Sequence, residues 1–228
     1  MLNLMFDSNV WISEGMLRIP QNFNVDKARK LQLSLAEKVL LQEINLEKVR
    51  FVGGVDVSYK EERAIASVAV LDYKTLKIVE AKTLKTEVHF PYVPSLLSFR
   101  EAQPILRVFK NLNFPPDVLM VEGHGIAHPY GCGLASHIGV VLKLPTIGVA
   151  KKLLCGEVGG YVGNYAPVIF QGKIVGVAVI TKQKSKPIYV SVGNMITLNQ
   201  ATEIVSKCVK NNRLPEPLRI VHLLTKIK

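Results

Sequence analysis

Three acidic residues stand where the sequence makes a carboxylate unusual. Asp56 interrupts the strand-like stretch 51-FVGGVDVSY-59, Glu101 lies near the start of an expected helix, and Glu122 ends the apolar run Val118–Val121. Aspartate is a poor strand residue, and an unpaired one in a central strand is costly. If the three carboxylates converge, they offer the oxygen ligands that Mg²⁺ and Mn²⁺ prefer. Such a site supports metal-assisted hydrolysis of a phosphodiester.

Each of these carboxylates also has a purely structural explanation. Asp56 would be ordinary on a strand whose second face is wet, and Glu122 would be ordinary at a strand exit with its head in solvent. Ser98 and Glu101 have the spacing of a capping box, in which the glutamate reaches back to the Ser98 amide. Local sequence favours this capping role for Glu101. Capping is compatible with a phosphate at the same helix N-terminus.

The segment that follows Glu122 is rich in glycine and histidine. Gly123 and Gly125 flank His124, so they leave room for a bulky ligand at the end of a strand. The C-terminal ends of strands are where open α/β sheets bind ligands. His124 and His128 are four residues apart, but Gly125 between them argues against a helical zinc-binding pair.

The first half of the chain is expected to form a helix, an antiparallel meander of three strands and a second helix. These elements are expected at Val25–Gln42 (capped by Asn24), Phe51–Tyr59, Ala64–Tyr73, Lys77–Val88 and about Phe99–Asn111.

The second half is expected to begin with a βαβ unit whose two strands are parallel. A hairpin, a further strand and two helices follow. The expected ranges are Val118–Val121, Leu134–Leu142, Thr146–Val149, Val168–Phe170, Ile174–Ile180, Ile188–Val192, Asn199–Asn211 and Pro217–Thr225. Together the elements predict a mixed α/β domain: an antiparallel meander plus a parallel βαβ unit, flanked by helices.

Composition indicates one substantial globular domain with a polyanionic partner. The 228 residues are 48% hydrophobic and 21% charged, which excludes long disorder, and the net charge of +11 favours nucleic acid over an anionic membrane. No apolar run approaches the roughly 18 residues of a membrane span. Three widely spaced cysteines predict reduced thiols in a cytoplasmic protein. Residues 1–24 are interpreted as a leader or extension that does not look like a signal peptide.

Four stretches, taken in order, resemble the endonuclease V family of deaminated-purine repair nucleases, over roughly Val25 to Lys226. They are 53-GGVDVSY-59, 90-FPYVPSLLSFREAQP-104, 117-DVLMVEGHGIAHPYGCGLASHIGVVLKLPTIGVAKKLL-154 and 215-PEPLRIVHLLT-225. The resemblance implies a ribonuclease H-like fold and makes residues 25–228 a single catalytic domain. It also implies a Mg²⁺-dependent deoxyribonuclease, with Mn²⁺ as a substitute. The enzyme would nick inosine-containing DNA at the second phosphodiester 3′ to deoxyinosine and leave 5′-phosphomonoester ends.

The resemblance assigns catalytic roles to five residues. Asp56 matches the first metal ligand and Glu101 the second acid, while Glu122 occupies a third acidic position where the family usually has aspartate. Its extra methylene shifts the carboxylate by about an ångström, so either the backbone compensates or activity is weakened and Mn²⁺ is preferred. Lys151 would contact the scissile phosphate or organise the attacking water, although a solvated lysine is the simpler alternative. His222 matches a histidine near the metal site.

The resemblance also assigns an aromatic wedge. Tyr92 matches a residue that senses the lesion, and Pro91 and Pro94 stiffen its loop. The alternative is a ring packed onto the core. Ser95 stands where glycine is usual, and Leu97 is counted with the substrate-binding residues.

Further residues are assigned to the extruded base and the phosphates. The base would occupy a pocket lined by Gly123, His124 and Gly125. Backbone phosphates would be touched by His128, Gly133 and Ser136. His137, by contrast, is expected to be a core histidine with its hydrogen bonds satisfied.

Three alternative functions follow from the same residues. They are an inosine-specific ribonuclease, a lesion-binding protein whose catalysis Glu122 has weakened, and a generic ribonuclease H-like nuclease. The sequence does not distinguish inosine in DNA from inosine in RNA, because no motif exposes a contact to the 2′-hydroxyl. We expect a monomer.

Overall fold

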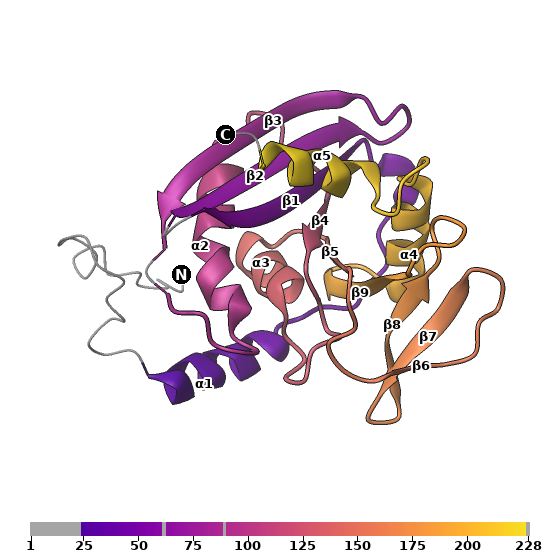
Figure 1. Ribbon diagram of the computed structural model, residues 1–228, viewed down its shortest axis with the longest axis horizontal. Helices are drawn as coiled ribbons and strands as arrows, with labels where there is room; N and C mark the ends of the chain where they lie inside the picture. Colours follow the sequence, from indigo (N-terminus) through magenta and orange to yellow (C-terminus); the bar gives the residue numbers. More distant parts are fainter. Residues whose placement is uncertain (1–23, 61–62, 89, 227–228) are drawn as a thin grey trace.

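A mixed β-sheet of nine strands forms the centre of the part of the chain described by the computed structural model, residues 24–60, 63–88 and 90–226 (Figure 1). The strands are arranged in the order β3-β2-β1-β4-β5-β9-β8-β7-β6. Their bounds are β1 Phe51–Lys60, β2 Arg63–Asp72, β3 Ile78–Glu87, β4 Val118–Glu122, β5 Thr146–Ala150, β6 Glu157–Val158, β7 Tyr165–Phe170, β8 Lys173–Val179 and β9 Ile188–Asn194. The predicted extension, residues 1–24, lies outside the described residues except for Asn24.

The sheet has a parallel centre and antiparallel sides. Strands β1, β2 and β3 form the predicted antiparallel meander, and β4 pairs in parallel with both β1 and β5. Strand β9 then pairs antiparallel with β5 and carries the β7–β8 hairpin and the short β6. The meander, the parallel unit and the hairpin are therefore confirmed. The sequence had not indicated β6.

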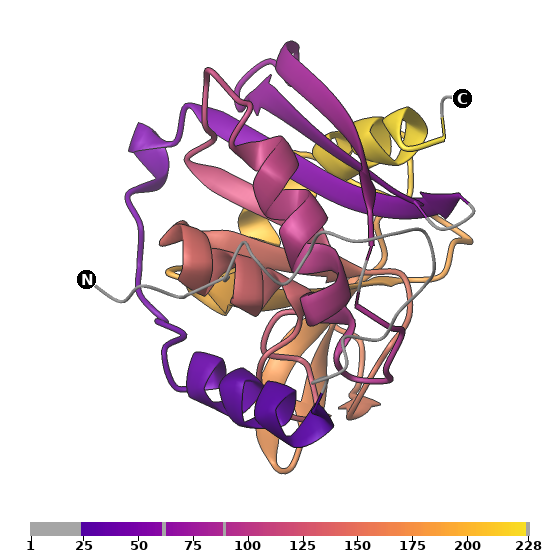
Figure 2. The same cartoon turned by 90° about the vertical axis from the view of Figure 1, so that its left-hand side faces the viewer.

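Helices cover both faces of the sheet, as Figure 2 shows. Their bounds are α1 Val25–Ala36, the short 3₁₀ helix η2 Leu46–Lys48, α2 Leu97–Phe109, α3 Leu134–Leu142, α4 Leu198–Lys207 and α5 Glu216–Leu224. One face is covered by α2 and α3, with α1 packed on α3, and the opposite face is covered by α4 and α5. No helix in the described ranges is long and apolar enough to cross a membrane.

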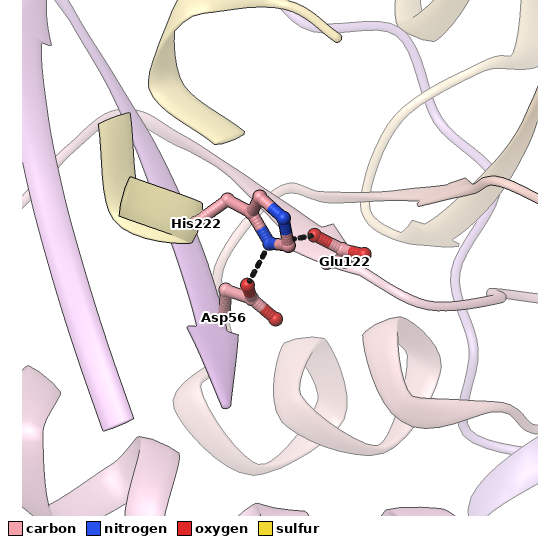
Figure 3. A group of neighbouring side chains, drawn as sticks. All are labelled: Asp56, Glu122 and His222. Atoms are coloured by element: carbon pink, nitrogen blue, oxygen red, sulfur yellow. Dashed lines mark hydrogen bonds and ion pairs between the residues drawn. The ribbon is translucent and has the colours of Figure 1, made fainter. Parts of the chain in front are cut away.

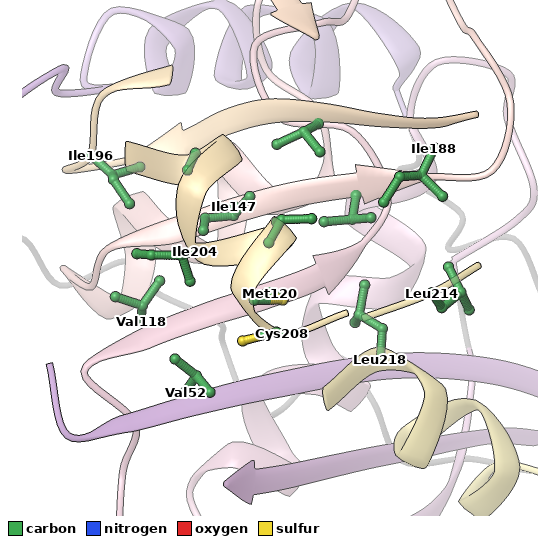
Figure 4. Packing of buried hydrophobic residues seen from close by; sticks show 14 of the residues in the cluster. Val52, Val118, Met120, Ile147, Ile188, Ile196, Ile204, Cys208, Leu214 and Leu218 are labelled. Carbon is green, nitrogen blue, oxygen red and sulfur yellow. The ribbon is translucent and has the colours of Figure 1, made fainter. Parts of the chain in front are cut away.

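Strand periodicity divides the apolar side chains between two cores. In β4, Met120 belongs to the core under α4 and α5, which is shown in Figure 4, whereas Leu119 and Val121 belong to the core under α2 and α3. Successive strand residues point to opposite faces, so this alternation also fixes the face on which each polar strand residue lies. Glu122 therefore points to the same face as Met120.

Two helices are shorter than the sequence predicted. Helix α1 ends at Ala36 rather than Gln42, because the chain beyond it is held extended: the Leu40 amide donates to Asn194 Oδ1 at 2.9 Å and its carbonyl accepts from the Met195 amide at 2.7 Å. Helix α4 ends at Lys207 rather than Asn211. In α1, tertiary hydrogen bonds outweigh the helical spacing of Val39 and Leu40.

Candidate metal centre

The parallel pairing of β1 and β4 brings two carboxylates side by side. Gly54 is paired with Met120 and Val55 with Val121, so Asp56 lies next to Glu122 at the ends of the paired segments. Both residues point to the face covered by α5, because residues two apart in a strand share a face. The sheet register therefore places together two acids that are far apart in the sequence.

Helix α5 lies along β1 at a distance that only a glycine permits. A Cβ atom on Gly54 would lie 2.4 Å from the carbonyl carbon and oxygen of Pro217. Further along, the Ser58 hydroxyl donates to the Thr225 carbonyl at 2.8 Å. From Pro217 to His222 the helix advances about 7.5 Å, and from Gly54 to Asp56 the strand advances about 6.6 Å, so the two residue pairs lie at similar heights along the helix and the strand. His222 is therefore placed directly above Asp56.

Asp56, Glu122 and His222 form a compact group of possible metal ligands (Figure 3). One ligand atom from each lies within 4.8 Å of the others. His222 Nδ1 is 3.0 Å from Asp56 Oδ2 and 3.7 Å from Glu122 Oε2, and the Lys151 ammonium forms an ion pair with the other oxygen of Glu122. Asp56 is only 8% exposed and Glu122 is half-buried, so the wet-face and solvent-head explanations are both wrong.

The electrostatics of this group favour a bound cation. Burial, and next to it the charge of Glu122, raise the pKa of Asp56, whereas His222 and Lys151 oppose that rise. Glu122 Oε2 is buried and has no hydrogen-bond partner among the described residues. Two crowded carboxylates, one with a buried oxygen that accepts no hydrogen bond, are a donor set that a divalent cation satisfies. The residues present therefore fit a divalent metal.

Glu101 lies near this group but outside it. Helix α2 begins at Leu97, so Ser98 lies within the helix and its hydroxyl is buried with no partner in the described chain; the predicted capping box is wrong. Burial, followed by the charge of Asp56, raises the pKa of Glu101 to about 8, although a hydrogen bond with Tyr59 opposes this rise. Direct metal ligation by Glu101 stays a prediction.

Comparisons with known proteins agree with this geometry. The model of the family Endonuclease V matches residues 33–223. The chain belongs to the endonuclease V family. Endonuclease V of Thermofilum pendens is 47% identical over 207 residues, which cover 90% of this chain and 89% of that protein.

Two solved structures of endonuclease V are also similar. The Bacillus subtilis structure has a TM-score of 0.85 and 29% identity, and covers 92% of this chain and 93% of its own. The Ciona intestinalis structure is a complex with a 24mer DNA containing an inosine followed by a ribo-adenosine. It has a TM-score of 0.81 and 31% identity, and the match covers 89% of this chain and 96% of the Ciona chain. These structures confirm the ribonuclease H-like fold, and family membership identifies the chain as a nuclease.

Two glycines that the endonuclease V resemblance assigned to the substrate, Gly125 to the base pocket and Gly133 to a backbone phosphate, permit close packing of the backbone. A Cβ atom on Gly125 would lie 1.8 Å from the Val192 carbonyl oxygen of β9, and one on Gly133 would lie 2.3 Å from the His124 carbonyl oxygen. Gly125 is buried, so the space expected for a ligand beside it is filled by β9. The expectation that Gly125 leaves room for a bulky ligand is therefore wrong, whereas the base pocket itself stays a prediction. Gly123 and His124 remain half-exposed at the exit of β4.

Sequence reasoning missed Gly148, which makes this close packing possible. A Cβ atom there would lie 2.4 Å from the Gly125 amide nitrogen, so only glycine lets the loop after β4 lie on β5. The available signal was a glycine in the interior of an expected strand, which often marks close approach of another backbone.

Two of the residues predicted to touch backbone phosphates, His128 and Ser136, have buried side chains, and their contact with phosphate stays a prediction. Ser136 is 0% exposed, and burial lowers the pKa of His128 to about 4, so its ring is neutral at pH 7. His137 is a core residue as predicted: the centres of its ring and the Phe99 ring are 5.0 Å apart, and burial lowers its pKa to about 4. Its Nδ1 has no partner among the described residues, however, so it is not fully satisfied.

Tyr92 is exposed in the loop before α2. Its side chain is 69% exposed, so the alternative of a ring packed on the core is wrong. Leu97, at the start of α2, is also exposed, and Pro91 is half-buried. Ser95 adopts a left-handed backbone conformation with φ +65°, which explains why glycine suits this position.

Proposed function

We propose that this chain hydrolyses the second phosphodiester bond 3′ to a deoxyinosine, in a reaction that requires Mg²⁺ and leaves a 5′-phosphate. The observation that carries the proposal is the group formed by Asp56, Glu122 and His222, whose ligand atoms lie within 4.8 Å of one another. Its position at the C-terminal end of parallel strands, where a ligand has access, supports a catalytic role. The complex of the Ciona relative with inosine-containing DNA supports the choice of substrate.

Asp56 and Glu122 are the residues proposed to hold the cation, and Glu101 is an additional candidate ligand. When bound, Mg²⁺ would activate water and neutralise charge on the phosphate; Mn²⁺ carries the same ligand preference. The extra methylene of Glu122 does not remove its carboxylate from the group. This observation counts against the alternative that the chain only binds the lesion.

Lys151 and His222 are proposed to act on the substrate and on the ligands. The Lys151 ammonium, held beside Glu122, would stabilise the negative charge that develops on the phosphate oxygens. His222 Nδ1 is hydrogen-bonded to Asp56 Oδ2 at 3.0 Å, which fixes the orientation of that carboxylate. We assign Nε2 of the same ring to proton exchange with the substrate.

Lesion recognition is proposed to begin with Tyr92. An exposed ring in a loop stiffened by Pro91 and Pro94 loses little entropy when it enters a base stack, and Leu97, five residues further along, is also exposed. Inosine is cheaper to unpair than a Watson–Crick base, which itself gives selectivity. Gly123 and His124 are the half-exposed residues that would contact the extruded base.

The central test is cleavage of an inosine duplex with Mg²⁺. We expect the parent chain to nick the inosine strand and Asp56→Asn to abolish nicking, because the variant removes one charge of the metal site without changing its shape. Glu43→Gln is the matched control, since Glu43 is exposed. Equal rates with and without EDTA would refute the proposal.

The inosine-specific ribonuclease remains a second candidate. The DNA bound to the Ciona relative contains an inosine followed by a ribo-adenosine, which supports this candidate. Cleavage of matched inosine DNA and inosine RNA, each with Mg²⁺ and with Mn²⁺, decides between the substrates. Monomeric state and cytoplasmic location stay predictions.

A further inference from the structure

Helix α1 carries a fully buried glutamine that joins two loops. Gln32 is 0% exposed, and its amide nitrogen donates to the Ser95 carbonyl at 3.0 Å and to the Cys132 carbonyl at 2.7 Å. Its amide oxygen accepts a hydrogen bond from Arg29. A buried amide is stable only when it is paired, so this side chain holds both carbonyls firmly.

Arg29 contacts the same two loops from the neighbouring turn of α1. One guanidinium nitrogen, Nη2, donates to the Ser95 hydroxyl at 2.8 Å. The guanidinium carbon lies 3.6 Å from the centre of the Tyr130 ring, in a cation–π contact. Arg29 and Gln32 therefore form one polar bridge between residue 95 and the segment 130–132.

Residue 95 requires such support. A left-handed backbone costs free energy in any residue with a Cβ atom, and it persists only where the surroundings hold it. Both the carbonyl and the hydroxyl of Ser95 are held by α1. Ser95 lies three residues after the exposed Tyr92, and the next residue, Leu96, is fully buried. The bridge thus fixes the base of the Tyr92 loop.

The second loop leads back to the exit of β4. The Tyr130 amide donates to His128 Nδ1 at 3.2 Å, and the Gly133 amide donates to the Gly125 carbonyl at 2.9 Å. Any displacement of α1 would therefore disturb both the Tyr92 loop and the segment next to His124.

We propose that Arg29 and Gln32 are positioning residues that hold the Tyr92 loop at a fixed offset from the loop after β4. In this arrangement, entry of the Tyr92 ring into the base stack and capture of the extruded base occur at the same nucleotide. The inference rests on the proposed role of Tyr92 in opening a paired lesion.

The test compares paired and unpaired inosine. Gln32→Leu keeps the volume but removes the hydrogen bonds, and Arg29→Met keeps the stem but removes the guanidinium. We expect each to lower single-turnover nicking of an inosine duplex by about tenfold, the effect of losing one or two hydrogen bonds. A single-stranded inosine oligonucleotide needs no wedge, so its nicking should stay within about twofold of the parent rate. Lys30→Ala, on the exposed side of α1, is the matched control.

Two further measurements distinguish a positioning role of Arg29 and Gln32 from a general loss of activity. Fluorescence of a 2-aminopurine next to the inosine, read in EDTA, should rise when the parent binds duplex and rise less with either variant. Tyr92→Ala combined with Gln32→Leu should nick duplex no more slowly than Tyr92→Ala alone. Equal losses on duplex and single strand, or additive losses in the double variant, would overturn the inference. If Gln32→Leu unfolds, Arg29→Met, whose side chain is only half-buried, decides.

Failure of the proposed function looks different. If the parent chain cuts no inosine strand, but 2-aminopurine fluorescence rises with the parent and rises less with the variants, only the nuclease assignment is refuted. If 2-aminopurine fluorescence does not rise when the parent chain binds the duplex, the positioning role of Arg29 and Gln32 is refuted.

Discussion

Replacing Gly54 with alanine tests whether the approach of α5 to β1 builds the metal centre. The new methyl carbon would lie 2.4 Å from the carbonyl carbon and oxygen of Pro217, and ordinary van der Waals contact begins at 3.4 Å. The obstacle is backbone rather than a flexible side chain, so the N-terminal turn of α5 has to move by the difference, about 1 Å. His222 is one turn further along the same helix and must move with it.

The displacement predicts losses of both activity and stability. A misplacement of about 1 Å costs about a hundredfold in rate, and overpacking of a core costs about 1–3 kcal/mol. For a chain of this size we expect Tm to fall by roughly 2–12 °C. Activity is measured as single-turnover nicking of an inosine duplex, and stability by thermal unfolding.

The control for Gly54→Ala is Gly160→Ala, because a Cβ atom at Gly160 meets nothing within 4 Å. It should match the parent in both assays. A Gly54→Ala protein that cuts at the parent rate and unfolds at the parent temperature would show that close approach of α5 does not position His222.

Three other outcomes are expected. Glu122→Asp should lower the nicking rate about tenfold or more, because the shorter side chain withdraws the carboxylate from Lys151 and His222; a faster variant would instead support the lesion-binding alternative. Lys151→Met should lower the rate about a hundredfold while duplex binding weakens far less, and equal effects on both would contradict a role in catalysis. Burial lowers the pKa of His137 from its ordinary value of 6.5 to about 4. Between pH 6.5 and 4 its imidazole is therefore protonated in the unfolded chain and neutral in the folded chain. The free energy of unfolding should therefore fall as pH drops from 6.5 to 4. In denaturant titrations, the His137→Leu variant should lose about 3 kcal/mol less of this free energy than the parent over that range. The same pH dependence in variant and parent would contradict this.

The two strand acids were predictable because strand geometry is simple. An aspartate in an expected central strand and a glutamate at the end of an apolar run are both unusual, because an unpaired carboxylate is costly there. Parallel pairing then brings Asp56 and Glu122 together. His222 was found only through family resemblance, because its place depends on how closely α5 approaches Gly54, and a sequence does not display such a distance.

Local patterns misled where one residue type serves several purposes. Ser98 and Glu101 have the spacing of a capping box, but the helix begins at Leu97 and buries Ser98. Gly125 was interpreted as clearing space for a base, yet β9 occupies that space. In both cases the sequence revealed a constraint without revealing which neighbour imposes it.

The placement of His222 has a consequence for the order in which the chain is synthesised. This residue follows its partner Asp56 by 166 positions and belongs to the last helix described. While the ribosome is still making the sheet, the nascent polypeptide has both acids but no histidine above them. On the proposed role of His222, we expect the chain to become able to cleave only late, after the rest of the domain has emerged. Proteolysis that clips α5 from the finished protein should return it to the same inert condition.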